Sequence, residues 1–334
     1  MRIVVTRRPP GDALDMLESA GQVWLWKEDR SIPRQVLEEQ VPTANALYTM
    51  VSDRIDRPLV DSAKRLVVIS NVGVGVDNID LEVCAERGIA VGNTPDVLTE
   101  TTADTAFGLL IAAARRFRGG LEYVRRGRWD GWEPTRFWGN DIHGSTLGLI
   151  GFGRIGRAMA RRAAGFRMNV LYTARHRQPL AEADLGTRYV GLQELLTESD
   201  HVVIAVSLTE ETRSMIDAAA FRAMKPTSTL VNISRGAVVD SEALVVALRT
   251  GEIAAAGLDV IDPEPPPTDH TLLHLENCYV LPHLGSSTER TRVAIAELAA
   301  ENVIAGLRGQ PLPAEVVPPA PDSVFPRNRR PLAG

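Results

Sequence analysis

The sequence predicts an α/β protein that folds into two domains, each built around a parallel sheet. Short apolar runs alternate with amphipathic stretches from end to end, which is the pattern of βαβ units. The chain has 334 residues, enough for about two domains of ordinary size. A glycine-rich turn at residues 151–156 stands between a strand pattern and a helix pattern, which places a βαβ unit in the middle of the chain.

Each expected strand is a short apolar run, and plausible helices separate the strands. In the first third of the chain we expect strands at residues 3–6, 23–26, 46–51, 66–71 and 89–91. Further on we expect strands at residues 146–151, 169–173, 202–207, 229–233, 255–260 and 279–281. These runs suffice for two sheets.

The domain boundary is expected at Thr99, where Thr-Glu-Thr-Thr opens a long alanine-rich helix pattern. After Pro282-His283 no further strand is readable, and an amphipathic helix over 288–307 is expected to return to the first domain. The domains are therefore expected to comprise 1–98 with 286–310, and 99–285. The proline-rich tail, 311–334, is expected to be extended or disordered.

Composition narrows the functional class. With 37 Lys and Arg against 42 Asp and Glu, the formal net charge is -5, so a nucleic-acid partner is not expected. The two cysteines, Cys84 and Cys278, are too few for a disulfide framework and favour a reducing, cytoplasmic location. The longest apolar stretch, 106–114, is under half of the roughly 20 residues that a membrane helix needs, so no membrane partner is expected.

The glycine-rich turn is the strongest local motif. Gly151, Gly153 and Gly156 permit a tight turn, close approach to a pyrophosphate, and close packing of helix on strand. The following helix, which begins near Arg154 and Ile155, presents its N-terminal N–H groups to the phosphates. A structural turn is the alternative, but this strand and helix context favours a dinucleotide-binding domain.

The end of the next strand predicts which dinucleotide binds. An NAD-binding unit usually carries an acidic residue there for the ribose 2′-hydroxyl. This chain has Arg175, His176 and Arg177 instead, and the two arginines can pair with a 2′-phosphate. NADP is therefore preferred over NAD, which stays possible. The alternative is a solvated basic turn.

Polar residues also follow the later strands, where ligands of parallel sheets bind. Arg235, Glu264 and His283 follow expected strands, and Asp259 lies inside the expected strand at 255–260. Each alone has an ordinary structural explanation, but an arginine, a glutamate and a histidine together supply an anion clamp and a tuned acid or base. A buried Asp259 also needs partners.

A metal site is not expected. His270, His274 and Cys278 are spaced as if on one helix face. However, they lie in a proline-rich connection, Cys278 enters a strand, and no HExxH motif accompanies them.

Seven motifs in one order resemble the D-isomer-specific 2-hydroxyacid dehydrogenases, over roughly residues 40 to 310. The branch most similar is the glyoxylate/hydroxypyruvate reductases. The motifs are the glycine-rich turn and residues 71–80, 94–103, 232–236, 256–260, 263–265 and 281–286. The resemblance implies two Rossmann or flavodoxin-like domains with the active site in the cleft between them, and a homodimer.

The resemblance also implies roles for individual residues. Arg235, Glu264 and His283 would be catalytic. Substrate would bind at Val74, Gly75, Arg235, His283, Ser286 and Trp138. Cofactor positions would be Thr102, Gly151, Gly153, Arg154, Ile155, Gly156, Arg175, His176, Arg177, Ser207, Ile233, Asp259 and Gly285.

The implied reaction is NAD(P)H-dependent reduction of glyoxylate or hydroxypyruvate to the D-2-hydroxy acid. Arg235 and the Val74 and Gly75 amides would hold the carboxylate, and His283, oriented by Glu264, would protonate the carbonyl oxygen as hydride arrives. Alternatives are 2-ketogluconate reduction, another D-2-hydroxyacid, phosphite oxidation, or a non-catalytic dinucleotide sensor like the C-terminal-binding-protein corepressors. Trp138 would reach the partner's site from a dimer arm, or else pack in its own subunit.

Overall fold

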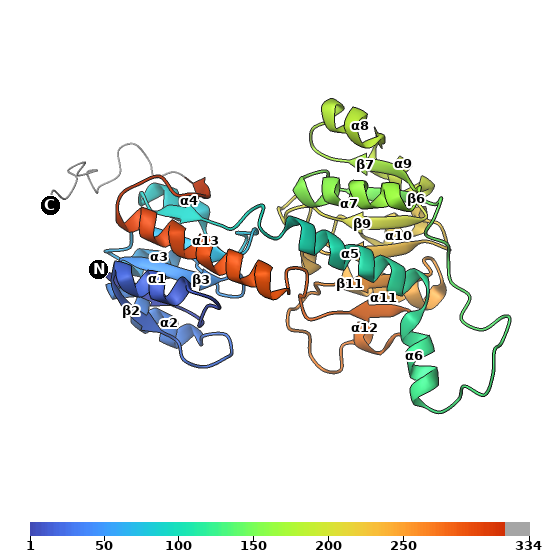
Figure 1. The fold of residues 1–334 in the computed structure, drawn as a ribbon, viewed down its shortest axis with the longest axis horizontal. Coiled ribbons are helices and arrows are strands. Elements are labelled where there is room, and N and C mark those ends of the chain that lie inside the picture. The colour runs from blue at the N-terminus through green and yellow to red at the C-terminus, as the bar shows by residue number, and fades with distance from the viewer. Residues whose placement is uncertain (318–334) are drawn as a thin grey trace. The chain divides into compact units, whose positions relative to one another are not determined.

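Residues 1–317 are described by a computed structural model, and they form two units (Figure 1). The first unit contains Met1–Leu98 and the chain from Ser287 on, and the second contains Thr99–Ser286. Ser286 thus belongs to the second unit, one residue beyond the expected boundary. Residues 318–334 of the expected tail lie outside the described residues.

The first unit has a six-stranded sheet in the order β13-β5-β4-β3-β1-β2, parallel except at β13. The strands alternate their side chains between two apolar layers, as a pleated strand requires. Ile3 and Val5 face one layer, and Val4 faces the other. The strands are β1 (Arg2–Val5), β2 (Gln22–Leu25), β3 (Ala46–Met50), β4 (Val68–Val72), β5 (Ala90–Gly92) and β13 (Glu315–Val317).

Helices cover both faces of this sheet. α1 and α13 contribute to one apolar layer and lie side by side, whereas α2, α3 and α4 contribute to the other (Figure 1). Tyr48 of β3 donates from its buried hydroxyl to the carbonyl of Ala296 in α13, at 3.3 Å. The helices are α1 (Ala13–Ala20), α2 (Arg34–Gln40), α3 (Arg57–Ser62), α4 (Leu81–Glu86) and α13 (Glu289–Leu307), with a 3-10 turn at Val41–Thr43.

The strand β13 corrects the expectation that no strand follows His283. It pairs antiparallel with β5 at the edge of the sheet. Asn302 of α13 anchors its approach, because the Asn302 Oδ1 accepts from the Ala314 N–H at 3.0 Å. Three residues beside a proline-rich stretch carry too little periodicity to be recognised in the sequence.

The second unit has a seven-stranded, fully parallel sheet in the order β12-β11-β10-β9-β6-β7-β8. The order reverses between β6 and β9, which creates a crevice at the carboxyl ends of these strands. The short strand β8 was not predicted, and two of its three residues are exposed. The strands are β6 (Thr146–Ile150), β7 (Asn169–Thr173), β8 (Thr187–Tyr189), β9 (His201–Ile204), β10 (Thr229–Asn232), β11 (Ala255–Leu258) and β12 (Cys278–Val280).

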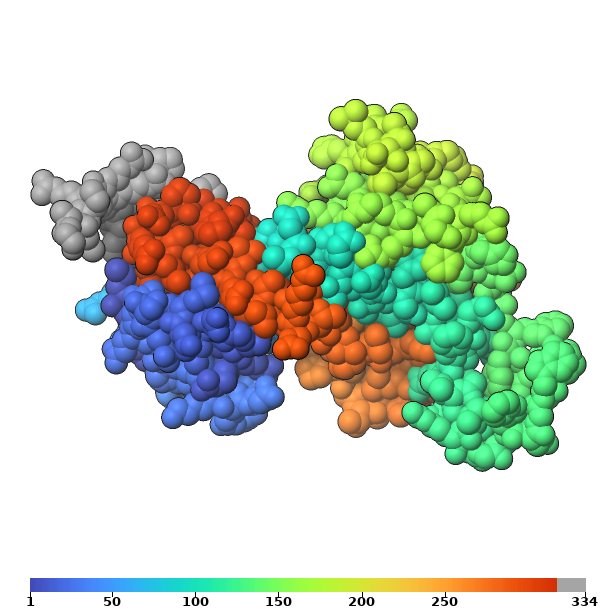
Figure 2. All heavy atoms as spheres, viewed as in Figure 1, coloured from blue at the N-terminus to red at the C-terminus, as the bar shows by residue number. Residues whose placement is uncertain are grey.

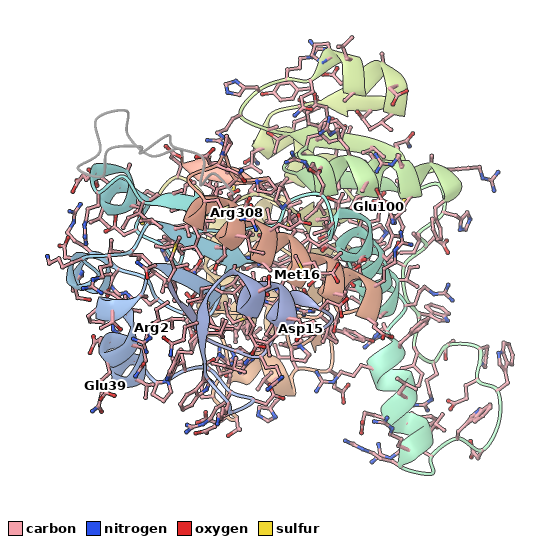
Figure 3. The ribbon with its side chains drawn as sticks, turned by 60° about the vertical axis from the view of Figure 1, so that its left-hand side comes forward. Arg2, Asp15, Met16, Glu39, Glu100 and Arg308 are labelled. Atoms are coloured by element: carbon pink, nitrogen blue, oxygen red, sulfur yellow. The ribbon has the colours of Figure 1, made fainter. Side chains whose placement is uncertain are left out.

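The helices of the second unit also form two layers. α5 and α7 pack together on one face, and α9 to α12 cover the other. Glu100 of α5, labelled in Figure 3, pairs with Arg161 and Arg162 of α7 at 2.6 and 2.7 Å. The helices are α5 (Thr99–Ala114), α6 (Phe117–Arg125), α7 (Arg154–Gly165), α8 (Pro179–Leu185), α9 (Leu192–Glu198), α10 (Ala218–Ala223), α11 (Ser241–Thr250) and α12 (Thr271–His274), with a 3-10 turn at Gly236–Val238.

The segment 117–141, which we call the arm, projects from the second unit (Figure 2). Its helix α6 has no buried residue. Its large exposed apolar side chains are Phe117, Leu121, Val124, Trp129, Trp132 and Trp138. Across residues 1–317, no helix has the length and apolar character needed to cross a membrane.

Candidate active site

Two glycines of the turn after β6 are required by the fold itself. Gly151 has a φ of +101°, and a Cβ there would lie 2.4 Å from the carbonyl oxygen of Ala205. A Cβ at Gly156 would lie 2.3 Å from the carbonyl oxygen of Gly151. These glycines allow the tight turn and the close contact of α7 with it.

Gly153 has no such requirement. Its φ of -75° and ψ of -159° are open to other residues, and no atom of the surrounding structure lies within 4 Å of the position its Cβ would take. Gly153 is the N-cap of α7, whose first N–H groups and dipole attract an anion. The open space at Gly153 therefore fits the close approach of a dinucleotide pyrophosphate, with Arg154 and Ile155 opening the helix.

The two arginines of the basic turn after β7 differ in their partners. Arg175, His176 and Arg177 are all exposed. Arg177 donates from Nε and Nη2 to both oxygens of Glu182, at 2.8 and 2.9 Å. This ion pair lowers the pKa of Glu182 and balances the charge of Arg177, whereas no acidic residue within 1–317 pairs with Arg175.

Aromatic contacts brace the basic turn against the glycine-rich turn. The ring of Tyr172 stacks on Phe152 with centroids 3.9 Å apart, and its hydroxyl donates to Glu182 at 2.6 Å. Gln178 joins the two turns, because its side chain donates to the Phe152 carbonyl at 3.1 Å and its N–H donates to the Tyr172 hydroxyl at 2.8 Å. Glu182 is not among the residues predicted from the sequence, and it lies in the next helix.

The residues expected to be catalytic follow three neighbouring strands. Arg235 follows β10, Glu264 follows β11, and His283 follows β12. A Cβ at Gly236 would lie 2.1 Å from the carbonyl carbon of Ile261, so the Arg235 turn packs backbone to backbone against the start of the Glu264 loop. The three side chains thus share one edge of one sheet.

His283 and Glu264 form a hydrogen-bonded pair. The His283 Nδ1 and the Glu264 Oε1 are 2.7 Å apart, and the side chains are 34% and 40% exposed. A carboxylate accepts only, so Nδ1 carries the proton in this bond. Nε2 is then the ring nitrogen that can exchange a proton with a ligand, and the Glu264 carboxylate fixes the ring plane.

Asp259 holds the corner that carries His283. Its carboxylate is 1% exposed and accepts from the N–H groups of Leu284 at 2.7 Å and Gly285 at 2.9 Å. Its carbonyl accepts from the His283 N–H at 3.0 Å, and His283 has a φ of 54°, in the left-handed region. Burial raises the pKa of Asp259, and the two N–H groups oppose that shift. The structure therefore gives Asp259 a backbone role beyond the nicotinamide contact that the resemblance implies.

Other expected site residues also lie in the second unit. Thr102 of α5 contacts the Gly285 position, and Thr105 donates to the Gly285 carbonyl at 3.3 Å. Ser207 and Ile233 lie just beyond β9 and β10, and Ser286 is half-buried beside the His283 corner.

Three expected site residues lie elsewhere. Val74 and Gly75 belong to the first unit, after β4. Trp138 is 69% exposed on the arm, and its indole N–H donates to the Pro134 carbonyl at 2.8 Å.

The two histidines considered as metal ligands make hydrogen bonds with backbone groups of nearby residues. The His270 Nδ1 accepts from the Leu272 N–H at 3.3 Å, and the His274 ring contacts the Thr268 carbonyl at 3.1 Å. No group of three metal-ligating side chains is present within residues 1–317.

Comparison with known proteins gives consistent matches. Residues 107–285 match the family model of the D-isomer specific 2-hydroxyacid dehydrogenase NAD binding domain. A glyoxylate reductase of Pyrococcus furiosus is 49% identical over 313 residues, which cover 92% of this chain and 93% of that protein.

Solved structures agree in fold. The TT0316 protein from Thermus thermophilus superimposes with a TM-score of 0.88 at 46% identity, covering 95% of this chain and 100% of that one. An NADPH-dependent glyoxylate/hydroxypyruvate reductase from Sinorhizobium meliloti, in complex with NADP and malonate, has a TM-score of 0.82 at 32% identity, covering 94% and 96%.

Proposed function

Since the chain belongs to the D-isomer specific 2-hydroxyacid dehydrogenase family, we propose that it reduces glyoxylate to the achiral glycolate, or hydroxypyruvate to the D-2-hydroxy acid, with NADPH as the preferred reductant. The observation that carries this proposal is the His283–Glu264 pair at 2.7 Å, on the sheet edge that also bears Arg235. Such an edge offers a proton donor and an anion clamp together. A bound nicotinamide dinucleotide supplies the hydride.

His283 is the general acid of the proposed reaction. Its Nε2 donates a proton to the carbonyl oxygen of the 2-oxo acid, while Nδ1 keeps its hydrogen bond to Glu264. The Glu264 carboxylate accepts from Nδ1 and so returns the ring to the same plane in each turnover. Asp259 is a positioning residue, because its carbonyl accepts from the His283 N–H and its carboxylate accepts from the Leu284 N–H.

Arg235 binds the substrate carboxylate and polarises the carbonyl as negative charge develops on its oxygen. The N–H groups of Val74 and Gly75 bind the same carboxylate. Ser286 lies beside the His283 corner and supplies a hydroxyl to the substrate.

The dinucleotide is held by the glycine-rich turn, the N-terminus of α7 and the residues Thr102, Ser207, Ile233 and Gly285. NADP preference follows from the basic turn. Arg175 has no acidic partner among the described residues and is the principal 2′-phosphate contact, with His176 beside it. Arg177 contributes through Nη1, since Glu182 occupies Nε and Nη2.

The proposed assembly is a homodimer formed through the arm. A run of exposed aromatic and aliphatic groups on a helix with no buried residue is typical of an interface. Trp138 is proposed to reach the partner's site and limit substrate size. Cys84 and Cys278 are free and buried, which favours a reducing, cytoplasmic compartment.

Steady-state oxidation of NADPH and, separately, NADH with glyoxylate and with hydroxypyruvate tests the function. We expect turnover with NADPH at a higher kcat/KM than with NADH. Absence of turnover with either reductant, together with measurable cofactor binding, would contradict the reductase proposal. Rates with 2-ketogluconate and phosphite, measured in parallel, identify a different substrate.

A further inference from the structure

The loop after β4 has its carbonyl groups held by asparagine side chains. We call residues 73–76 the substrate loop. The Val74 carbonyl accepts from the Asn93 Nδ2 at 2.8 Å, and the Gly75 carbonyl accepts from the Asn71 Nδ2 at 2.6 Å. The Val74 and Gly75 carbonyls share their peptides with the N–H groups of Gly75 and Val76, so the asparagines act on the opposite side of those two peptides.

A third carbonyl is held in the same way, since the Gly73 carbonyl accepts from the Thr94 N–H at 3.0 Å. The peptide bonds of the substrate loop are trans, and in a trans peptide the N–H and the C=O point in opposite directions. The held carbonyls of Gly73, Val74 and Gly75 share their peptides with the N–H groups of the next residues. The N–H groups of Val74, Gly75 and Val76 therefore point away from the donors that hold those carbonyls.

Those three N–H groups have no acceptor in residues 1–317. Val74 is 39% exposed, so the loop is accessible to a ligand. Successive N–H groups in a turn can form a concave anion site, and a carboxylate has the acceptors to match such a site. The structure thus adds Val76 to the two amides that the resemblance implies.

The amide orientation of Asn71 is set by a second asparagine. Asn78 approaches the carbonyls of Met50 and Asp53 with its Nδ2, at 3.2 and 3.0 Å, which identifies that atom as the nitrogen. Its Oδ1 then accepts from the Asn71 Nδ2 at 3.1 Å. Asn71 is fully buried, so a turned amide would leave a buried carbonyl without its donor.

We propose that Asn93 and Asn71 are positioning residues that aim the N–H groups of Gly75 and Val76 at the carboxylate of the 2-oxo acid, beside the N–H of Val74. This inference rests on the proposed function. Each position requires an amide, because an aspartate would set a carboxylate oxygen against a carbonyl oxygen and reverse the tilt of the peptide.

Substitution of the more accessible asparagine gives the cleanest test. Asn93→Asp is expected to raise KM for glyoxylate about tenfold, the factor that one hydrogen bond to a charged ligand supplies. The kcat at saturating glyoxylate and the KM for NADPH are expected to stay within twofold. The inhibition constant of oxamate, an unreactive analogue of a 2-oxo acid, is expected to rise in parallel.

Asn45→Asp is the matched control. The Asn45 amide also donates to a carbonyl, that of Arg65, but at the opposite end of β3 from the substrate loop. This variant is expected to keep the wild-type KM. Asn71→Asp, which alters a buried residue, is a second variant, and its melting temperature tells whether it has folded.

A folded Asn93→Asp variant with wild-type KM for glyoxylate and wild-type oxamate inhibition would overturn the inference. Failure of the proposed function looks different, because the wild type would then not oxidise NADPH at all. In that case oxamate alone is the probe. It must raise the melting temperature of the wild type but not of Asn93→Asp, and equal shifts or no shift would also overturn the inference.

Discussion

The His283 corner and the basic turn of the second unit are held in place by different means. The corner is fixed by a buried carboxylate and by backbone hydrogen bonds between neighbouring strand ends. The basic turn is exposed, and it is held by the ion pair of Arg177 with Glu182, by the aromatic stack and by the two hydrogen bonds of Gln178. The difference indicates that the proposed proton donor is tightly positioned, whereas the proposed choice of reductant depends on a few surface residues.

The largest effect is expected from His283→Ala. Loss of a general acid lowers kcat by about two to four orders of magnitude. The dissociation constant of NADPH, measured by its fluorescence, is expected to remain unchanged because the basic turn is intact. A variant with near wild-type turnover would show that another group donates the proton.

Asp259→Asn is expected to have the next largest effect. An asparagine retains one acceptor but sets an NH₂ donor against one of the two N–H groups, so the corner loosens. We expect kcat to fall about 10- to 100-fold, and equally with both reductants. Asp217→Asn, at the cap of α10, is a control, because Asp217 also accepts two N–H groups but lies outside the site. Equal losses in both variants would contradict the assignment.

Arg175→Ala is expected to act on one reductant only. Loss of a charge-assisted contact to the 2′-phosphate raises KM for NADPH about tenfold or more and leaves the kinetics with NADH unchanged. Glu182→Gln is expected to have a smaller effect of the same kind, because it releases Arg177 and keeps an acceptor for Tyr172. Equal KM changes for NADPH and NADH would place the 2′-phosphate elsewhere.

The smallest predicted effect concerns stability and pH at His201. This fully buried ring bonds the Asp141 carbonyl at 3.1 Å, and burial lowers its pKa below the ordinary value of 6.5. The unfolded chain therefore binds a proton at higher pH than the folded chain, so the folded state loses stability as pH falls below about 6.5. Denaturant unfolding from pH 7 to 5 is expected to show a weaker pH dependence in His201→Gln. An identical slope in both proteins would contradict this.

The sequence predicted most of the fold because the parallel strands are buried apolar runs. The eleven expected strands occur with ends shifted by a few residues, and the two-sheet α/β class is confirmed. β8 and β13 were missed, since three-residue edge strands carry almost no period. The family resemblance read from the motifs is confirmed by the comparisons.

For the candidate site, the sequence indicated which residue types to expect but not which groups they bond to. The requirement that a buried Asp259 has partners followed from desolvation, but its partners are backbone N–H groups that no spacing reveals. Glu182 neutralises Arg177 across a helix boundary, which composition of the turn alone could not indicate. Asn71 and Asn93 act through carbonyls, and their effect depends on peptide orientation, which exists only in the folded chain.

The most direct test of the account is the ratio of kcat/KM for NADPH to that for NADH, measured at saturating glyoxylate in the wild type, Asp259→Asn and Arg175→Ala. We predict a high ratio in the wild type, the same ratio at lower absolute rates in Asp259→Asn, and a ratio reduced about tenfold or more in Arg175→Ala. A ratio that changes in Asp259→Asn, or stays unchanged in Arg175→Ala, would contradict the separation of catalysis from reductant choice.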